Sequence, residues 1–150
     1  MNRLKIELAY QWEPVLKEEN REYLFPQIIT SFMKRRYKLP AIYRWNIFNK
    51  EPEYEKLIYI GEAQELCPQR INGYLNPGRF QQTNKRINKR FQDQLKKGFR
   101  IKLEILQFNK INIEDFTFTN NDLHDKHFRR LLEELMIIIC KQKGVKILNL

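Results

Sequence analysis

Cysteine, histidine and long apolar runs are all scarce in this sequence. Cys67 and Cys140 are the only cysteines among 150 residues, too few for a disulfide framework, so we expect two free thiols in a reducing cytosol. No run of about 18 apolar residues occurs, which predicts no membrane span. Residues 1–14 lack the apolar core and small residues of a signal peptide. These features predict a cytoplasmic protein.

The two histidines give no sign of a zinc site. His124 and His127 are not at metal-ligand spacing with either cysteine, whereas structural zinc sites combine closely spaced Cys and His. We therefore interpret both as surface or capping residues.

Positive charge is the strongest compositional feature. The net charge is +10, and residues 79–110 alone carry 10 basic and 2 acidic side chains. Such a concentration suits a polyanion, through phosphate neutralisation and counterion release. The alternative is a solvated basic helix that binds nothing in particular.

The order of the elements predicts one α/β (α+β) domain. Four segments have either the residue types or the apolar–polar alternation that is typical of strands: 4–12, 41–48, 56–63 and 99–108. The second and third of these are expected to form a hairpin across a polar loop at 49–55. We expect helices at 13–24, from Pro26, at 65–75, at 84–97 capped by Thr83, and at 123–143 capped by Asn121 or Asp122, with an Asn-rich loop at 109–121. Residues 40–150 then form a small, mainly antiparallel three-stranded sheet flanked by helices, and residues 1–39 an N-terminal strand and helix elaboration.

The pattern also predicts which helix faces are buried. The basic helix should bury Ile87, Phe91 and Leu95. The buried stripe expected for the last helix comprises Phe128, Leu131, Leu132, Leu135, Ile138 and Ile139.

Five ordered motifs resemble the GIY-YIG nuclease family. They are AIY at 41–43, YIGEA at 59–63, an Arg on the following helix with a Tyr four residues later, LLEELMI at 131–137, and LN at 148–149. The TNKRIN segment at 83–88 also looks like small stand-alone members. The resemblance covers residues 40–150 and favours a bacterial or phage origin.

The resemblance implies a metal-dependent endonuclease that hydrolyses DNA to 5′-phosphate and 3′-hydroxyl products. Tyr43 takes the place of the residue that acts as, or assists, the general base, and Tyr59 that of the residue that orders the water. Arg70 matches the phosphate-binding Arg, and Asn149 the supporting Asn. A Glu of the last helix would hold one Mg²⁺ or Mn²⁺ ion.

Elementary chemistry is consistent with these roles. The Arg70 guanidinium fits two phosphate oxygens, and a carboxylate is a hard ligand for Mg²⁺. Because a free Tyr has a pKa of about 10, Tyr43 needs a nearby Arg and cation to favour the phenolate. Gly61 allows close approach at the end of its strand. Tyr74 and Asn84 are further supporting candidates.

The metal ligand is ambiguous between two neighbours. Glu133 and Glu134 point about 100° apart on a helix, so only one can face the site. Glu133 shares a stripe with Ile137, and Glu134 with Ile138. We favour Glu133 and keep Glu134 as the alternative.

The sequence departs from the family pattern in three places. The first motif is AIY instead of GIY, 15 residues separate Tyr43 from Tyr59, and Arg70 follows Gly61 by nine positions with Pro68 between. A longer hairpin loop and a shifted helix start would accommodate these differences.

The basic segment supplies the expected DNA contacts. We assign phosphate binding to Arg79, Lys85, Arg86, Lys89 and Arg90. Such contacts position a duplex without reading its sequence, so specificity would need residues 1–39, a partner or a homodimer. The alternatives are a nucleic-acid-binding module with an inactive nuclease site, and an interaction protein whose basic helix is incidental.

Overall fold

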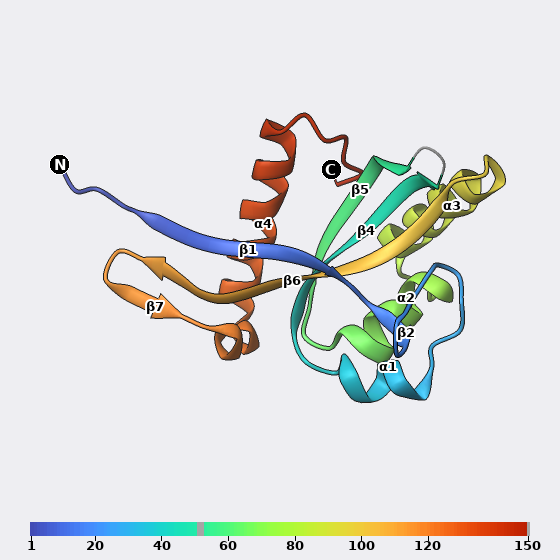
Figure 1. Ribbon diagram of the computed structural model, residues 1–150, viewed down its shortest axis with the longest axis horizontal. Helices are drawn as coiled ribbons and strands as arrows, with labels where there is room; N and C mark the ends of the chain where they lie inside the picture. Colours follow the sequence, from blue (N-terminus) through green and yellow to red (C-terminus); the bar gives the residue numbers. More distant parts are fainter. Residues whose placement is uncertain (51–52, 150) are drawn as a thin grey trace.

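The chain forms a mixed α+β structure built on an antiparallel sheet (Figure 1). The structure is a computed structural model that describes residues 1–50 and 53–149, with the backbone alone at residues 50 and 53–56. The strands are β1 (Ile6–Pro14), β2 (Leu16–Glu18), β3 (Arg21–Glu22), β4 (Ala41–Lys50), β5 (Glu53–Ala63), β6 (Arg100–Ile113) and β7 (Phe116–Phe118). The helices and helical turns are α1 (Ser31–Arg36), η1 (Leu66–Arg70), α2 (Ile71–Leu75), α3 (Gln82–Lys96), η2 (Asn120–His124) and α4 (Lys126–Gln142).

The main sheet has five strands, whereas three were predicted. The order is β1-β6-β4-β5, and β7 pairs with the end of β6. The hairpin of β4 and β5 is confirmed, with Tyr43 opposite Gly61 and Trp45 opposite Tyr59. Of the loop predicted between these strands, residues 51–52 lie outside the described residues.

Two predicted segments have different structures. The segment 13–24, predicted to be a helix, contains the end of β1 and the small β2–β3 hairpin. After the hairpin, Tyr23 and Phe25 alternate into the core. The predicted loop at 109–121 is the end of β6, then β7 and η2. Ile111 pairs with Phe118 there, and these side chains join an apolar cluster that local composition does not reveal.

Several helix limits also differ from the prediction. α1 starts at Ser31, where the Thr30 side chain accepts a hydrogen bond from Met33 N, and not at Pro26. Gln81 rather than Thr83 precedes α3. α4 is capped by Asp125, whose carboxylate accepts from His127 N, because η2 uses the residues expected as caps.

Two apolar clusters occupy opposite faces of the sheet. Side chains of Tyr43, Trp45 and Ile47 meet α1, α2 and α3 on one face, where Tyr23 and Phe25 of the N-terminal segment also pack. Ile42, Ile58 and Ile60 point to the other face, which α4 covers. Because successive strand residues alternate between faces, the hairpin links both clusters.

The buried faces of the helices are partly as predicted. Ile87 and Phe91 of α3 are buried, and Leu95 is half-buried. On α4, Leu131 is 36% and Ile138 54% exposed, contrary to prediction, whereas Met136, Ile137 and Cys140 are buried. The stripe of α4 is therefore rotated toward the Glu133 side of the helix.

Candidate active site

The β4–β5 hairpin brings Tyr43 and Tyr59 to the same face of the sheet. Tyr43 lies opposite Gly61. Tyr59 lies opposite Trp45, which follows Tyr43 by two residues on β4 and therefore points to the same face. Since a slip of one residue would exchange the two faces, the apolar alternation of both strands determines this arrangement. Tyr43 is 1% exposed, and Tyr59 is half-buried.

Gly61 makes room for the Tyr43 ring. A Cβ at this position would lie 2.5 Å from Tyr43 Cζ, closer than any ordinary contact between carbon atoms. The Tyr43 hydroxyl group thus lies over the bare backbone of Gly61. The group that approaches Gly61 is thus the side chain of Tyr43, whereas backbone or substrate was expected to come close there.

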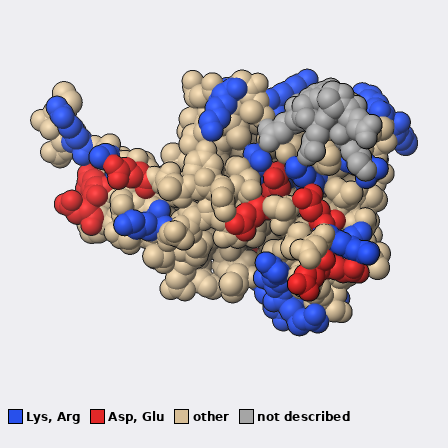
Figure 2. Space-filling view, viewed as in Figure 1, with Lys and Arg blue, Asp and Glu red and all other residues tan. Residues whose placement is uncertain are grey.

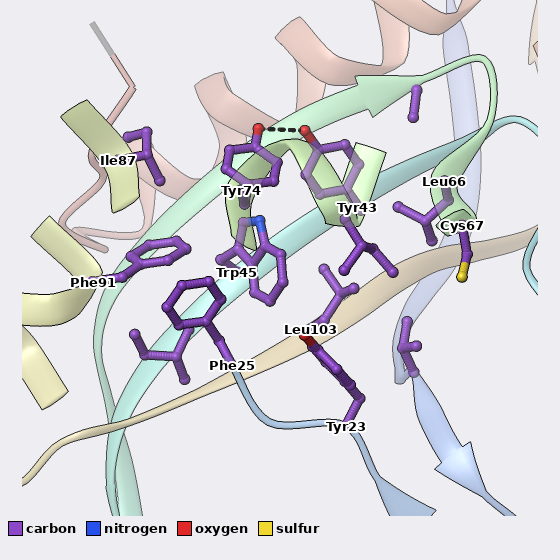
Figure 3. Close-up of a cluster of buried hydrophobic side chains, with 14 of the residues drawn as sticks. Tyr23, Phe25, Tyr43, Trp45, Leu66, Cys67, Tyr74, Ile87, Phe91 and Leu103 are labelled. Carbon is purple, nitrogen blue, oxygen red and sulfur yellow. Dashed lines mark hydrogen bonds between the residues drawn. The ribbon is translucent and has the colours of Figure 1, made fainter. Parts of the chain in front are cut away.

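A third tyrosine joins the pair. Tyr74 of α2 is hydrogen-bonded to Tyr43, with 2.6 Å between the two Oη atoms, as Figure 3 shows. The Tyr74 ring centroid is 6.1 Å from that of Tyr59 and 6.2 Å from that of Tyr43. Burial raises the pKa of both Tyr43 and Tyr74 well above 10, because it disfavours the phenolate.

Arg70 supplies positive charge to this cluster. It ends η1, directly before α2, and is half-buried. Its guanidinium lowers the pKa of the Tyr43 hydroxyl and of the Glu133 carboxyl, although burial has the larger, opposite effect on each pKa. Arg70 is therefore close enough to act electrostatically on side chains from β4 and from α4.

A polar cleft of about 240 Å³ opens beside Arg70. Its lining comes from the end of β5, from η1 and α2, and from the start of α3: Gln64, Glu65, Gln69, Arg70, Gly73, Gln81 and Asn84. Asn84, a predicted supporting residue, thus shares this cleft with Arg70. The cleft has the polarity that a hydrated, charged ligand requires.

The structure distinguishes the two candidate carboxylates. Glu133 is half-buried and Glu134 exposed, in line with the buried Ile137 and the exposed Ile138 one turn later. The pKa of Glu133 is raised to about 6. Burial has the largest effect, and the negative charges of Glu62 and Glu134 add smaller effects in the same direction. Glu133 also acts on the pKa of Tyr43, which places it at the tyrosine cluster.

The donor set near Glu133 fits a hard divalent cation. Oxygen ligands suit Mg²⁺ and Mn²⁺, and here a carboxylate has a pKa raised in part by surrounding negative charge. A cation would relieve that repulsion. Among the described residues there is no group of three or more His, Cys, Asp or Glu side chains that could hold a metal ion, so water and substrate oxygens would have to complete the coordination.

Glu62 and Arg129 form an ion pair that sequence reasoning missed. Arg129 Nε lies 2.6 Å from Glu62 Oε2, and the Arg129 side chain is 5% exposed. Arg129 also donates to the carbonyl oxygens of Leu123 and His124. This pair anchors the start of α4 to β5 and thereby positions Glu133 one turn further along the helix. No local signal in the sequence indicated it.

Asn149 bonds to the backbone of β5. Its Nδ2 donates to Ile60 O at 2.6 Å, and its Oδ1 accepts from Ile60 N at 2.9 Å. The C-terminal segment also forms a parallel bridge between Ile147 and Ile58. Asn149 therefore stabilises the strand that carries Tyr59, which is how this side chain can support the site.

The basic residues assigned to DNA lie at the start and along one side of α3. Arg79, Lys85, Lys89 and Arg90 are exposed, and Arg86 is half-buried. Lys85 Nζ donates to Arg79 O at 2.8 Å, which orders the segment before the helix. On the face drawn in Figure 2, Lys and Arg side chains are interspersed with Asp and Glu side chains.

The remaining sequence predictions concern thiols, histidines and membrane spans. Neither Cys67 nor Cys140 forms a disulfide, and both are buried. Burial raises the pKa of the Cys67 thiol to about 11. His124 and His127 are exposed. No helix in the described part of the chain has the length and apolar character needed to cross a membrane.

Comparisons with known proteins identified no match for this chain. No protein-family model matches the chain, and the searches of curated proteins and of solved structures found no match either.

Proposed function

We propose that this chain is a metal-dependent endonuclease of the GIY-YIG type that hydrolyses DNA phosphodiester bonds. One observation supports the proposal most directly: Arg70 and Glu133, from separate elements, both act electrostatically on the buried hydroxyl of Tyr43. Residues scattered from position 43 to position 133 thus converge on one point.

Each residue has a task in this proposal. Arg70 binds the scissile phosphate through its guanidinium fork and offsets the charge that develops there. Tyr59 and Tyr43 orient the attacking water, and Tyr43 accepts its proton or assists that transfer. Tyr74 holds the Tyr43 Oη in place through their 2.6 Å hydrogen bond.

Glu133 would hold a single divalent cation, and Glu134 remains the alternative ligand. When bound, the cation supplies positive charge that stabilises the leaving oxygen and lowers the pKa of nearby oxygen acids. Because burial holds the pKa of Tyr43 above its usual value, positive charge from Arg70 and the site is required before Tyr43 can act as a base at neutral pH.

The test is cleavage of supercoiled plasmid and of single-stranded oligonucleotides in Mg²⁺, Mn²⁺ or EDTA. We expect metal-dependent cutting that is lost in Tyr43→Phe, Arg70→Ala and Glu133→Ala, because each variant removes one function of the site. Glu134→Ala is the matched control and should keep the activity. Retained activity in Glu133→Ala, or cutting that persists in EDTA, would contradict the proposal.

The burial of Tyr43 also favours a second candidate, a nucleic-acid-binding module with an inactive site. A phenol that is 1% exposed can accept a proton only if substrate binding opens a path to it. The inactive module predicts DNA binding without cleavage on every substrate and with every metal, and unchanged affinity in Tyr43→Phe.

A further inference from the structure

The free edge of β1 lies outside the proposed active site. β1, the second half of β6 (106–113) and β7 form a wing that extends from the body toward the N-terminus (Figure 1). β1 pairs with β6 on one side, and no strand of the described chain pairs with its other side. An unpaired edge of this length is a template for another strand.

The orientation of the β1 backbone can be derived from its hydrogen bonds. Lys5 O accepts from Glu114 N, and Val15 N donates to Leu103 O, so odd-numbered residues direct their N–H and C=O groups toward β6. The irregularity in the pairing lies on β6, where residues 109 and 110 both stand opposite Ala9. β1 itself is therefore regular, and its even-numbered residues direct their backbone groups outward.

The sequence of β1 is complementary to itself about Ala9. In an antiparallel pair with its two-fold axis at Ala9, Lys5 lies opposite Glu13 of the second copy. The outward-directed backbone groups pair Ile6 with Trp12 and Leu8 with Tyr10, each pair occurring twice. Ile6, which is 39% exposed, would then lie beside an indole ring, a favourable cross-strand pair.

Neighbouring two-fold registers are less favourable. An axis at Glu7 places Glu7 opposite its own copy, and an axis at Tyr10 places Glu7 opposite Glu13. Like charges directly opposite one another are destabilising. An axis at Leu8 places Arg3 opposite Glu13. Because Arg3 precedes β1, this charge pair would lie outside the strand.

We propose that this chain forms a homodimer in which two β1 strands pair antiparallel about Ala9 and join the two sheets into one. The dimer does not depend on nuclease activity. An isologous contact of this kind closes on itself, so it covers the β1 edges of both copies.

The position of the axis can be tested with a single cysteine. Under mild oxidation Ala9→Cys should give mostly disulfide-linked dimer, because the two Cβ atoms directly face each other in a non-hydrogen-bonded pair. Lys110→Cys is the matched control, since Lys110 is exposed on the same wing but one strand away from the axis; it should stay mostly monomeric. Equal cross-linking of both variants would overturn the proposal.

Solution mass and a charge exchange provide the second test. The 18.5 kDa chain should have twice that mass by light scattering at micromolar to ~100 μM concentrations. Lys5→Glu should raise the dissociation constant at least tenfold, and the double variant Lys5→Glu/Glu13→Lys should restore it. A monomer throughout this range, a dimer insensitive to Lys5→Glu, or a partner of another kind on this edge would each reject the β1 homodimer.

Discussion

At the scale of single residues, the position and the surroundings of the Tyr43 side chain depend on three neighbouring residues. Gly61 offers no Cβ, so the aromatic ring can cross β5. Tyr74 donates or accepts one hydrogen bond, which limits the rotation of the Tyr43 hydroxyl group. Glu133 adds a carboxylate with a pKa of about 6. Each contribution can be removed separately.

Substituting Gly61→Ala should destabilise the protein and displace Tyr43. The added methyl group would meet the ring at 2.5 Å from Cζ, and overpacking of this kind costs about 1–3 kcal/mol. Urea unfolding measures the loss. Gly78→Ala is the control, because its Cβ would meet the exposed Gln81 side chain no closer than 3.3 Å. An equal, small effect of both substitutions would contradict the role assigned to Gly61.

Replacing Glu133 with Gln should stabilise the protein at pH 7.5 and not at pH 4. The pKa of Glu133 is raised from 4.5 to about 6, so the folded state binds this proton more tightly than the unfolded chain. The resulting stability is present below about pH 4.5 and is lost as the pH rises through 6. We expect a gain of about 1 kcal/mol at pH 7.5 after allowing for solvent screening, measured by urea titration at both pH values.

The same variant tests the proposed cation without an activity assay. Millimolar Mn²⁺ should raise the Tm of the parent, because a ligand that binds only the folded state stabilises it. The rise should disappear in Glu133→Gln and persist in the control Glu134→Gln, whose side chain is exposed. Loss of the shift in Glu134→Gln alone would move the ligand to the neighbouring residue.

At the scale of elements, the C-terminal segment acts as a short extra strand on β5. Leu148 N donates to Ile58 O, and Ile58 N donates to Lys146 O. The Asn149 amide then binds both backbone groups of Ile60. The segment thereby holds the edge of the sheet next to Tyr59.

Asn149→Ala should release this segment. Loss of two hydrogen bonds to a partly buried backbone costs about 1–3 kcal/mol, and the Ile60 amide should exchange its hydrogen faster by at least tenfold. Native-state hydrogen exchange measures both effects. Asn121→Ala is the control, since Asn121 is exposed on η2. Unchanged exchange at Ile60 would show that the backbone bridge alone keeps the segment in place.

At the scale of the whole molecule, most of the net positive charge comes from α3, the residues that flank it, and β6. Residues 79–110 contribute a net +8 of the total +10, and four of the five assigned residues are exposed. If this surface binds DNA, affinity must fall steeply with salt. Each phosphate contact contributes about −0.9 to the slope of log affinity against log salt concentration.

The double variant Lys89→Ala/Arg90→Ala should reduce that slope by about 2, in line with two lost contacts. Fluorescence anisotropy with a labelled duplex across a salt series is the measurement. The control is Lys141→Ala/Lys143→Ala, which removes the same charge from the exposed end of α4. Equal reductions in both double variants would indicate attraction by net charge rather than a binding face on α3.

The candidate site residues could be named from the sequence because short motifs fix their chemistry. Tyr43, Tyr59 and Gly61 stand on strands whose alternation is visible locally, whereas the burial of Ile137, on the same side of α4 as Glu133, was not predicted. The ion pair of Glu62 with Arg129 could not be foreseen, since 67 positions separate its members. Likewise the Asn149 amide reaches a backbone 89 positions away.

By itself, the sequence determined the α+β class, the β4–β5 hairpin, the basic helix and the alternation that puts two tyrosines on one face, because these follow from local periodicity and composition. The tertiary structure alone decided that the sheet has five strands, that residues 16–22 form a hairpin, and that α4 buries Ile137 rather than Ile138. Those outcomes depend on which distant apolar surface each segment meets. Burial against such partners outweighs local preference, since most of the stability of a helix or strand comes from packing.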